Sequence, residues 1–261
     1  MNILRHESRW HIRLLRGWIL AVFLTLALFL SFYTSFEAEA ENLIDMLEGF
    51  PREVMQGFGL DVTSFGTFSG YLAYIYTFIQ LLLGILAVLC GMQLIGREKL
   101  NKTSDFLFSK PISRSSMWAQ KILVGILGMV LVNGLIALTV YVLARLQDHP
   151  FDAPLKRVLI GSLLVQLILF FLGALLSSMK KRIKTVTGPA ASIGMGFYFL
   201  LIIGRLLEEE KLLKLSIYGL FDASVVERHP LETTNIVIAF VLILVFAGVG
   251  YWRYTQEDLE V

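Results

Sequence analysis

Long apolar runs alternate with short polar connections along the whole chain. Six runs reach the length of about 20 residues that an α-helix needs to cross the hydrocarbon core of a bilayer. They cover residues 18–36, 71–95, 117–144, 158–179, 186–204 and 236–252. The pattern therefore predicts an all-α membrane protein with six transmembrane helices, in which residues 1–261 form a single domain.

The charged residues gather between these runs. We expect all 23 Lys and Arg and all 21 Asp and Glu residues to lie in termini or connections. Lys121, near the start of the third run, is counted with the connection before it. Only 17% of the chain is charged and its mean hydropathy is +0.69, whereas soluble domains carry about 25% charged residues. This composition excludes a soluble enzyme, a disordered chain and a disulfide-rich secreted domain.

The basic residues also predict an orientation. Fifteen Lys and Arg residues fall on the side of the two termini and eight on the other side. Because basic residues are enriched in cytoplasmic loops, both termini should be cytoplasmic. One alternative is a signal peptide cleaved near Ala38-Glu39-Ala40, which would leave five spans, although its apolar run exceeds the usual 7–15 residues.

Three connections have helical character of their own. Residues 1–17 alternate apolar side chains with Arg and His, which predicts an amphipathic N-terminal helix on the cytoplasmic surface, as an anchor or a specific lipid contact. The acidic external connection 37–70 carries Leu43, Ile44, Leu47 and Phe50 at helical spacing, which predicts a short interfacial helix. The external segment 205–235 is too apolar for a free loop and too short to span, so we expect a re-entrant or interface-lying helix.

The cytoplasmic connection after the second run holds three adjacent large apolar residues, Phe106, Leu107 and Phe108, between charged residues. Such a group on a surface loop is typical of a docking contact, and the alternative is that it lies in the headgroup region. Pro111 should end any helix before it, and Ser113 can cap the helix that follows.

This connection resembles one in the permease subunit of ABC-2-type ABC transporters. The matching residues are Glu98, Thr103, Phe106-Leu107-Phe108 and Pro111-Ile112-Ser113-Arg114, with Lys102 where the family commonly has Gly. The resemblance extends to the basic start, the acidic first external loop, the six spans and a charged tail with Asp258. It implies a single transmembrane permease domain that pairs with a second, identical or paralogous, permease subunit.

The resemblance also implies a coupling helix between spans two and three. In such transporters this helix sits in a groove of a separate ATP-binding subunit. By that analogy, the residues that would enter the groove are Thr103, Asp105, Phe106, Leu107 and Phe108. Glu98 and Arg114 would lie at the two ends of the contact.

The sequence shows no motif for catalysis or nucleotide binding. It has no Gly-x-x-x-x-Gly-Lys-Ser/Thr motif, and its four histidines lie outside the predicted spans. We therefore expect no enzyme activity, no metal site and no bound cofactor, with ATP and Mg²⁺ on the partner subunit and no nucleic acid. The interpretation is a multi-pass exporter permease in a bacterial or archaeal plasma membrane. The alternative is a non-transporting membrane assembly or sensor partner of an ATPase complex; a lipid-modifying enzyme is the weakest hypothesis.

A few residues inside the spans are candidates for further roles. Gln80, Asn133 and Gln166 would either hydrogen-bond between helices or line a translocation path. Gly188, Ser192 and Gly196 form a small-residue ladder for packing inside the subunit or for a dimer contact, and the family resemblance places the dimer seam at spans one and five. Tyr71, Tyr74 and Tyr76 should belong to an interfacial aromatic belt.

Overall fold

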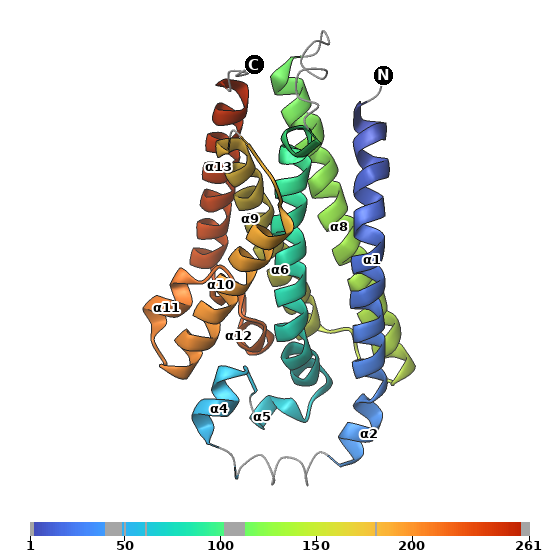
Figure 1. Cartoon of the computed structure of the whole chain (residues 1–261). Coiled ribbons are helices and arrows are strands. Elements are labelled where there is room, and N and C mark those ends of the chain that lie inside the picture. The colour runs from blue at the N-terminus through green and yellow to red at the C-terminus, as the bar shows by residue number, and fades with distance from the viewer. Residues whose placement is uncertain are drawn as a thin grey trace.

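The computed structural model describes residues 3–39, 49, 51–60, 62–101, 113–180 and 182–256, and within these ranges it is helical with no strand. Six helices are long and apolar enough to cross a membrane, as the sequence predicts. They are α1 (Ile3–Ser31), α6 (Phe68–Asn101), α8 (Arg114–Leu146), α9 (Ala153–Met179), α10 (Thr187–Leu206) and α13 (Thr233–Gln256). They run side by side, and both termini lie at the same end of the bundle (Figure 1), as an even number of spans requires. We call this the terminal end.

Helices α6 and α9 form the centre of the bundle, and they are the two spans whose apolar stretches are mostly buried. They approach closely because glycines face the opposing backbone. An added Cβ at Gly91 would lie 2.0 Å from the carbonyl oxygen of Phe170, and one at Gly173 would lie 2.4 Å from that of Val88. Small residues at such contacts let membrane helices pack backbone to backbone. On one side of this centre lies α8, with α1 packed against it, and on the other side lie α10 and α13.

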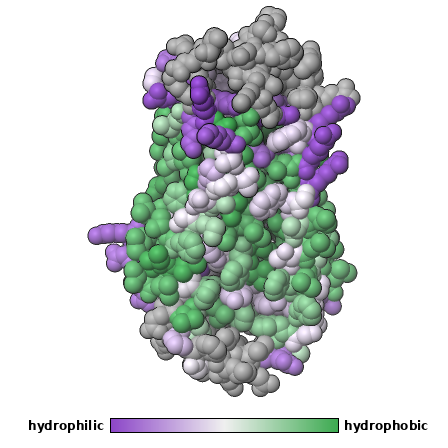
Figure 2. All heavy atoms as spheres, viewed as in Figure 1, coloured by the Kyte–Doolittle hydropathy of each residue, from purple (hydrophilic) through white to green (hydrophobic). Residues whose placement is uncertain are grey.

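Figure 2 shows one face of the bundle, on which apolar residues cover most of the middle and most of the polar side chains lie toward the ends. Large apolar residues on the outer helices are exposed in this single chain, among them Leu20 of α1, Leu138 of α8 and Leu244 of α13. Since water would disfavour so continuous an apolar belt, lipid or another membrane protein must cover it. The surface agrees with a multi-pass membrane protein.

The N-terminal stretch differs from the expected surface helix. It continues without a break into the first span, so that α1 is one helix of 29 residues. Glu7, His11 and Leu15, spaced by four, are all buried. The imidazole of His11 lies against Gly128 of α8, where an added Cβ would come within 2.4 Å of Nε2. One face of the amphipathic stretch therefore packs on the bundle.

Short helices close the end opposite the termini (Figure 1). They are α2 (Tyr33–Ala38), α4 (Arg52–Gly57), α5 (Val62–Phe65), α11 (Glu210–Leu215), η1 (Gly219–Phe221) and α12 (Ala223–Arg228). The interfacial helix predicted from Leu43 to Phe50 falls largely outside the described residues. The 205–235 segment is three short helices instead of one, and part of it turns inward: Tyr218 is fully buried, with its ring over Gly84 of α6.

Two expectations from the sequence are wrong in detail. Lys121 lies inside the third span, on α8, and is fully buried, so one charge is not confined to a connection. Tyr76 is also fully buried and therefore is not part of an interfacial belt. Tyr71 instead donates a hydrogen bond to the carbonyl of Phe29 over 3.0 Å, and joins α6 to α1. In each case the side chain lies inside the bundle, whereas the sequence pattern assigns it to the boundary.

Candidate functional site

The candidate site lies at the terminal end, where α6 ends at Asn101 and α8 begins at Arg114. The predicted central contact residues Thr103, Asp105, Phe106, Leu107 and Phe108 lie outside the described residues. The two predicted end residues, Glu98 and Arg114, are described. The sequence correctly predicts the start of α8, because the Ser113 side chain accepts a hydrogen bond from the backbone N–H of Ser116 over 3.3 Å.

Three consecutive charged residues end α6, and each one contacts a different helix. Arg97 pairs with Glu7 of α1 at 3.3 Å. Glu98 pairs with Lys121 of α8 at 2.6 Å. Lys99 donates to two carbonyl oxygens at the end of α9, those of Ser177 (3.0 Å) and Lys180 (2.8 Å). Successive helical residues point about 100° apart, so a run of three can reach three neighbours.

The Glu98–Lys121 pair is the most buried part of this arrangement. The Lys121 side chain is fully buried and that of Glu98 is 12% exposed. The ammonium also donates to the carbonyl of Leu94 over 2.6 Å and lies 3.7 Å from the carboxylate of Glu7. Burying an ammonium is costly unless it is paired and hydrogen-bonded, and these contacts meet both conditions.

The other side of the connection is also fixed. Arg114, the first residue of α8, donates from Nη1 to the carbonyl of Thr255 in α13 over 3.2 Å. The guanidinium of Arg97 lies 4.4 Å from the ring centroid of Trp10, which adds a cation–π contact to the α1 attachment. We refer to Arg97, Glu98, Lys99 and Arg114 with these partners as the charged frame. The frame ties the ends of α6 and α8 to α1, α9 and α13.

The frame connects the two ends of this connection to the rest of the bundle. Ion pairs and hydrogen bonds join the end of α6 and the start of α8 to three other spans. Packed helices with such contacts shift as units because protein interiors do not deform continuously. The arrangement therefore suits a mechanical contact better than a catalytic one, and within the described residues no cluster of three His, Cys, Asp or Glu could hold a metal ion.

The candidate path residues fall into two groups. Asn133 and Gln166 face each other across α8 and α9 and exchange two hydrogen bonds, of 2.9 and 3.0 Å. Gln166 also donates to Ser162 over 3.1 Å and is fully buried. Gln80 of α6 is buried without a hydrogen bond to either of them. The amide pair joins two helices of one subunit, and a path-lining role for the three residues stays a prediction.

The small-residue ladder lies on the outside of the chain. Gly188, Ser192 and Gly196 are exposed on α10, and an added Cβ at either glycine would meet nothing within 4 Å. The opposite face of α10 packs inward, where a Cβ at Gly194 would lie 2.6 Å from Ile85 of α6. Packing of the ladder inside the subunit is therefore wrong, while its use in a dimer contact stays a prediction.

Sequence reasoning missed several parts of the frame. It counted Lys121 as a loop residue, and it gave no site role to Glu7, Arg97 or Lys99. One signal was present: Lys121 lies near the start of the third apolar run and Glu98 lies just after the end of the second, so the two can come close if their helices pack side by side. That adjacency is a tertiary fact that the sequence pattern does not contain.

Comparison with known protein families identifies this chain. A family model described as "ABC-2 family transporter protein" matches residues 1–259, which is nearly the whole chain. No curated protein matches. The match covers all six spans, the connection between α6 and α8, and the charged frame.

Proposed function

Since the chain belongs to the ABC-2 family of transporter proteins and is an ABC transporter permease, we propose that it forms half of an exporter's translocation path and that a separate ATP-binding subunit drives it. Two permease subunits, identical or paralogous, would enclose the path. Two ATP-binding subunits would dock beneath them at residues 102–112. In this proposal the terminal end faces the cytoplasm of a bacterial or archaeal cell, and ATP and Mg²⁺ bind to the partner.

The charged frame is the observation that carries this proposal. A permease without nucleotide chemistry must receive its driving force through a contact, and the contact must be joined rigidly to the spans that move. The connection between α6 and α8 is attached on one side through Arg97, Glu98 and Lys99 and on the other through Arg114. Movement of residues 102–112 would thus be passed to five spans at once.

The exposed face of α10 supports the proposal of a second permease subunit. Gly188, Ser192 and Gly196 leave a shallow strip on the outside of the chain, and such strips allow the backbones of two membrane helices to approach. Exposed apolar residues of α1, such as Phe23 and Phe29, offer a further surface. We propose that α1 and α10 form the contact between the two permeases.

The docking contact can be tested by co-purification with the ATP-binding subunit that this proposal requires. Phe106→Asp or Leu107→Asp places a charge in the proposed groove contact, so we expect loss of the partner or of its substrate-stimulated ATP hydrolysis. Leu207→Asp is the matched control, because Leu207 is 65% exposed at the opposite end of the bundle. Unchanged coupling in both docking variants would refute the assignment of the docking segment. A coupled complex that moves no substrate across vesicles would instead favour the assembly or sensor role.

A further inference from the structure

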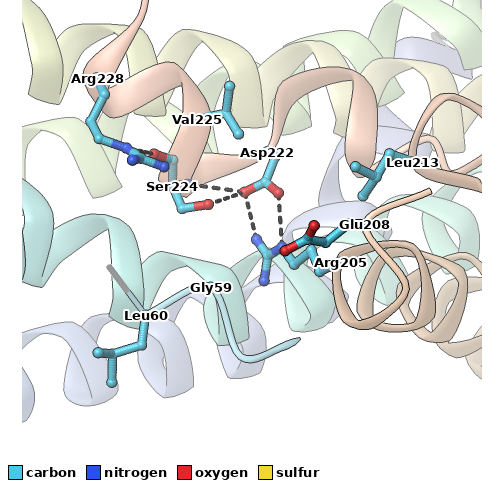
Figure 3. A pocket seen from close by; sticks show the side chains of 9 residues that line it. All are labelled: Gly59, Leu60, Arg205, Glu208, Leu213, Asp222, Ser224, Val225 and Arg228. Carbon is cyan, nitrogen blue, oxygen red and sulfur yellow. Dashed lines mark hydrogen bonds and ion pairs between the residues drawn. The ribbon is translucent and has the colours of Figure 1, made fainter. Parts of the chain in front are cut away.

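A cavity of about 390 Å³ opens at the end of the bundle opposite the termini. Figure 3 shows the side chains that line it, which come from the segment after α4, the end of α10, and helices α11 and α12. The cavity falls within the volume range of roughly 300–1,000 Å³ that small-molecule sites occupy. Its lining residues are Gly59, Leu60, Arg205, Glu208, Leu213, Asp222, Ser224, Val225 and Arg228.

The guanidinium of Arg205 is fixed in this cavity by one edge. Nε donates to Oδ2 of Asp222 over 2.8 Å, and Nη2 donates to Oδ1 of the same carboxylate. The side chain is only 7% exposed. This two-point contact between planar groups holds the orientation of the guanidinium.

The remaining nitrogen of that guanidinium has no acceptor. Nη1 of Arg205 is buried and makes no hydrogen bond within the part of the chain that the structure describes. A buried, charged donor without an acceptor is costly, and a site of this kind is stabilised when a ligand supplies the missing oxygen. Asp222 cannot supply it, because its carboxylate already accepts from Arg205 and from the backbone N–H and hydroxyl of Ser224.

The ionisation of Asp222 keeps this arrangement charged. Burial alone would raise the pKa of its carboxyl, but the Arg205 guanidinium and the hydrogen bonds from Ser224 outweigh burial and lower the pKa. The two groups therefore neutralise each other at neutral pH, and what remains is a donor aimed away from Asp222.

Gly59 lies directly beside this donor. Its φ of +71° is a backbone conformation that residues with a side chain rarely adopt. An added Cβ would lie 2.5 Å from Nη1 of Arg205, so any side chain there would fill the approach to that nitrogen. The glycine thus fits both the turn and the close approach of a bound oxygen.

The rest of the lining carries one further charge of each sign and an apolar wall. Arg228 donates from Nε to the carbonyl of Ser224 and brings a second guanidinium to the cavity. The carboxylate of Glu208 lies on the same cavity. Leu60, Leu213 and Val225 complete the wall. This combination suits a ligand that joins an anion to a cation on a partly apolar body.

We propose that this cavity binds the phosphate group of a phospholipid headgroup that also carries an amine. The phosphate oxygens accept from Nη1 of Arg205 and from Arg228, and the amine faces Glu208. A tetrahedral phosphate offers acceptors in several directions and can therefore serve two guanidinium groups. The neighbouring Leu206, Leu207 and Leu215 are exposed at this end of the bundle, which favours a lipid over free phosphate as the source of the group.

The test is calorimetric titration of the purified full chain in detergent with three probes: glycerophosphoethanolamine, glycerophosphoglycerol and inorganic phosphate. Glycerophosphoethanolamine should bind best, because it alone carries the amine. Arg205→Lys keeps a cation beside Asp222 but removes the free edge, and Gly59→Ala fills the space beside Nη1. Each should weaken glycerophosphoethanolamine by about tenfold or more, which is the loss expected for one charged hydrogen bond.

Two further variants sharpen the result. Glu208→Gln should weaken glycerophosphoethanolamine but strengthen inorganic phosphate, because the negative charge attracts the amine and repels the free anion. Lys214→Gln is the control, since Lys214 is exposed on α11 and pairs with Glu210 outside the cavity, and it should change neither affinity. If Arg205→Lys unfolds the chain, the affinity of Gly59→Ala for glycerophosphoethanolamine tests the proposal.

Three outcomes would overturn the proposal: no binding of any probe, affinities that Arg205→Lys and Gly59→Ala leave unchanged, or tighter binding of inorganic phosphate than of glycerophosphoethanolamine by the unaltered chain. A final arm identifies the source of the group. Nanodiscs that contain phosphatidylethanolamine should compete with the soluble probe, and a failure to compete would exclude the lipid. None of these measurements depends on an ATP-binding partner, so their failure is separate from that of the transport proposal.

Discussion

Loss of the Glu98–Lys121 pair should separate the two helices that flank the docking segment. The ammonium and carboxylate lie 2.6 Å apart and the lysine side chain is fully buried. At an effective dielectric constant of about 20, charges at this distance attract by about 6 kcal/mol. Much of this is offset by desolvation, and breaking a buried pair from one side typically costs about 3–5 kcal/mol because the other charge stays buried.

The variant Glu98→Gln removes the negative charge and nearly preserves volume. Lys121 would keep the carbonyl of Leu94 at 2.6 Å and the carboxylate of Glu7 at 3.7 Å, so we expect a loss near the lower limit, about 3 kcal/mol. Lys121→Met leaves the Glu98 carboxylate buried without its cation and should likewise cost about 3 kcal/mol. The double variant removes both charges and should cost no more than either single change, which gives a coupling energy of about 3 kcal/mol or more.

The assay is reversible unfolding of the purified chain in mixed micelles, for both single variants and the double variant. The control is the Glu210–Lys214 pair of α11, which is 3.0 Å apart but has side chains 82% and 68% exposed. Glu210→Gln should cost less than about 1 kcal/mol, as exposed pairs do. If Glu98→Gln costs no more than this control, or if the two variants at Glu98 and Lys121 add without coupling, the reasoning about the charged frame is wrong.

Three further predictions address other parts of the fold. Gln166→Leu should cost about 1–3 kcal/mol of unfolding free energy because the buried Oδ1 of Asn133 loses its donor, although Nδ2 keeps the carbonyl of Met129. The double change of Asn133 and Gln166 to Leu should cost much less. Equal losses in micellar unfolding would contradict their mutual hydrogen bonding. Because the pKa of Asp222 is lowered from 3.8, its stabilising contribution is complete above that value and is lost as pH falls below it. Unfolding temperatures of the unaltered chain minus those of Asp222→Asn should therefore be constant from pH 5 to 8 and shrink only below about pH 4, and a decline already at pH 6 would refute this. Gly194→Leu should disrupt the fold because a side chain there meets Ile85. Gly188→Leu and Gly196→Leu should leave folding of the monomer unchanged and weaken its self-association. If crosslinking yields stay constant in both of these variants, α10 does not form the dimer contact.

The sequence determined the architecture because a bilayer imposes a length and a polarity on each span. All six spans follow from apolar runs of about 20 residues, and Ser113 follows from the chemistry of a helix start. The family is visible in the residues from Glu98 to Arg114. These features depend on local sequence and on the solvent, so they need no knowledge of which helices are neighbours.

Only the tertiary structure decided how the polar residues are used. Glu98 and Lys121, Asn133 and Gln166, and Arg205 and Asp222 become pairs because α6, α8, α9 and the 205–235 segment lie together. The same folding turns Gly194 inward and leaves Gly188 and Gly196 outside. The hydrophobic pattern indicates that a position avoids water. It does not distinguish a position that faces lipid from one that faces the protein interior, because both environments exclude water. Helix packing therefore determines the partner of each buried polar group, and this partner cannot be predicted from the order of residues along the chain.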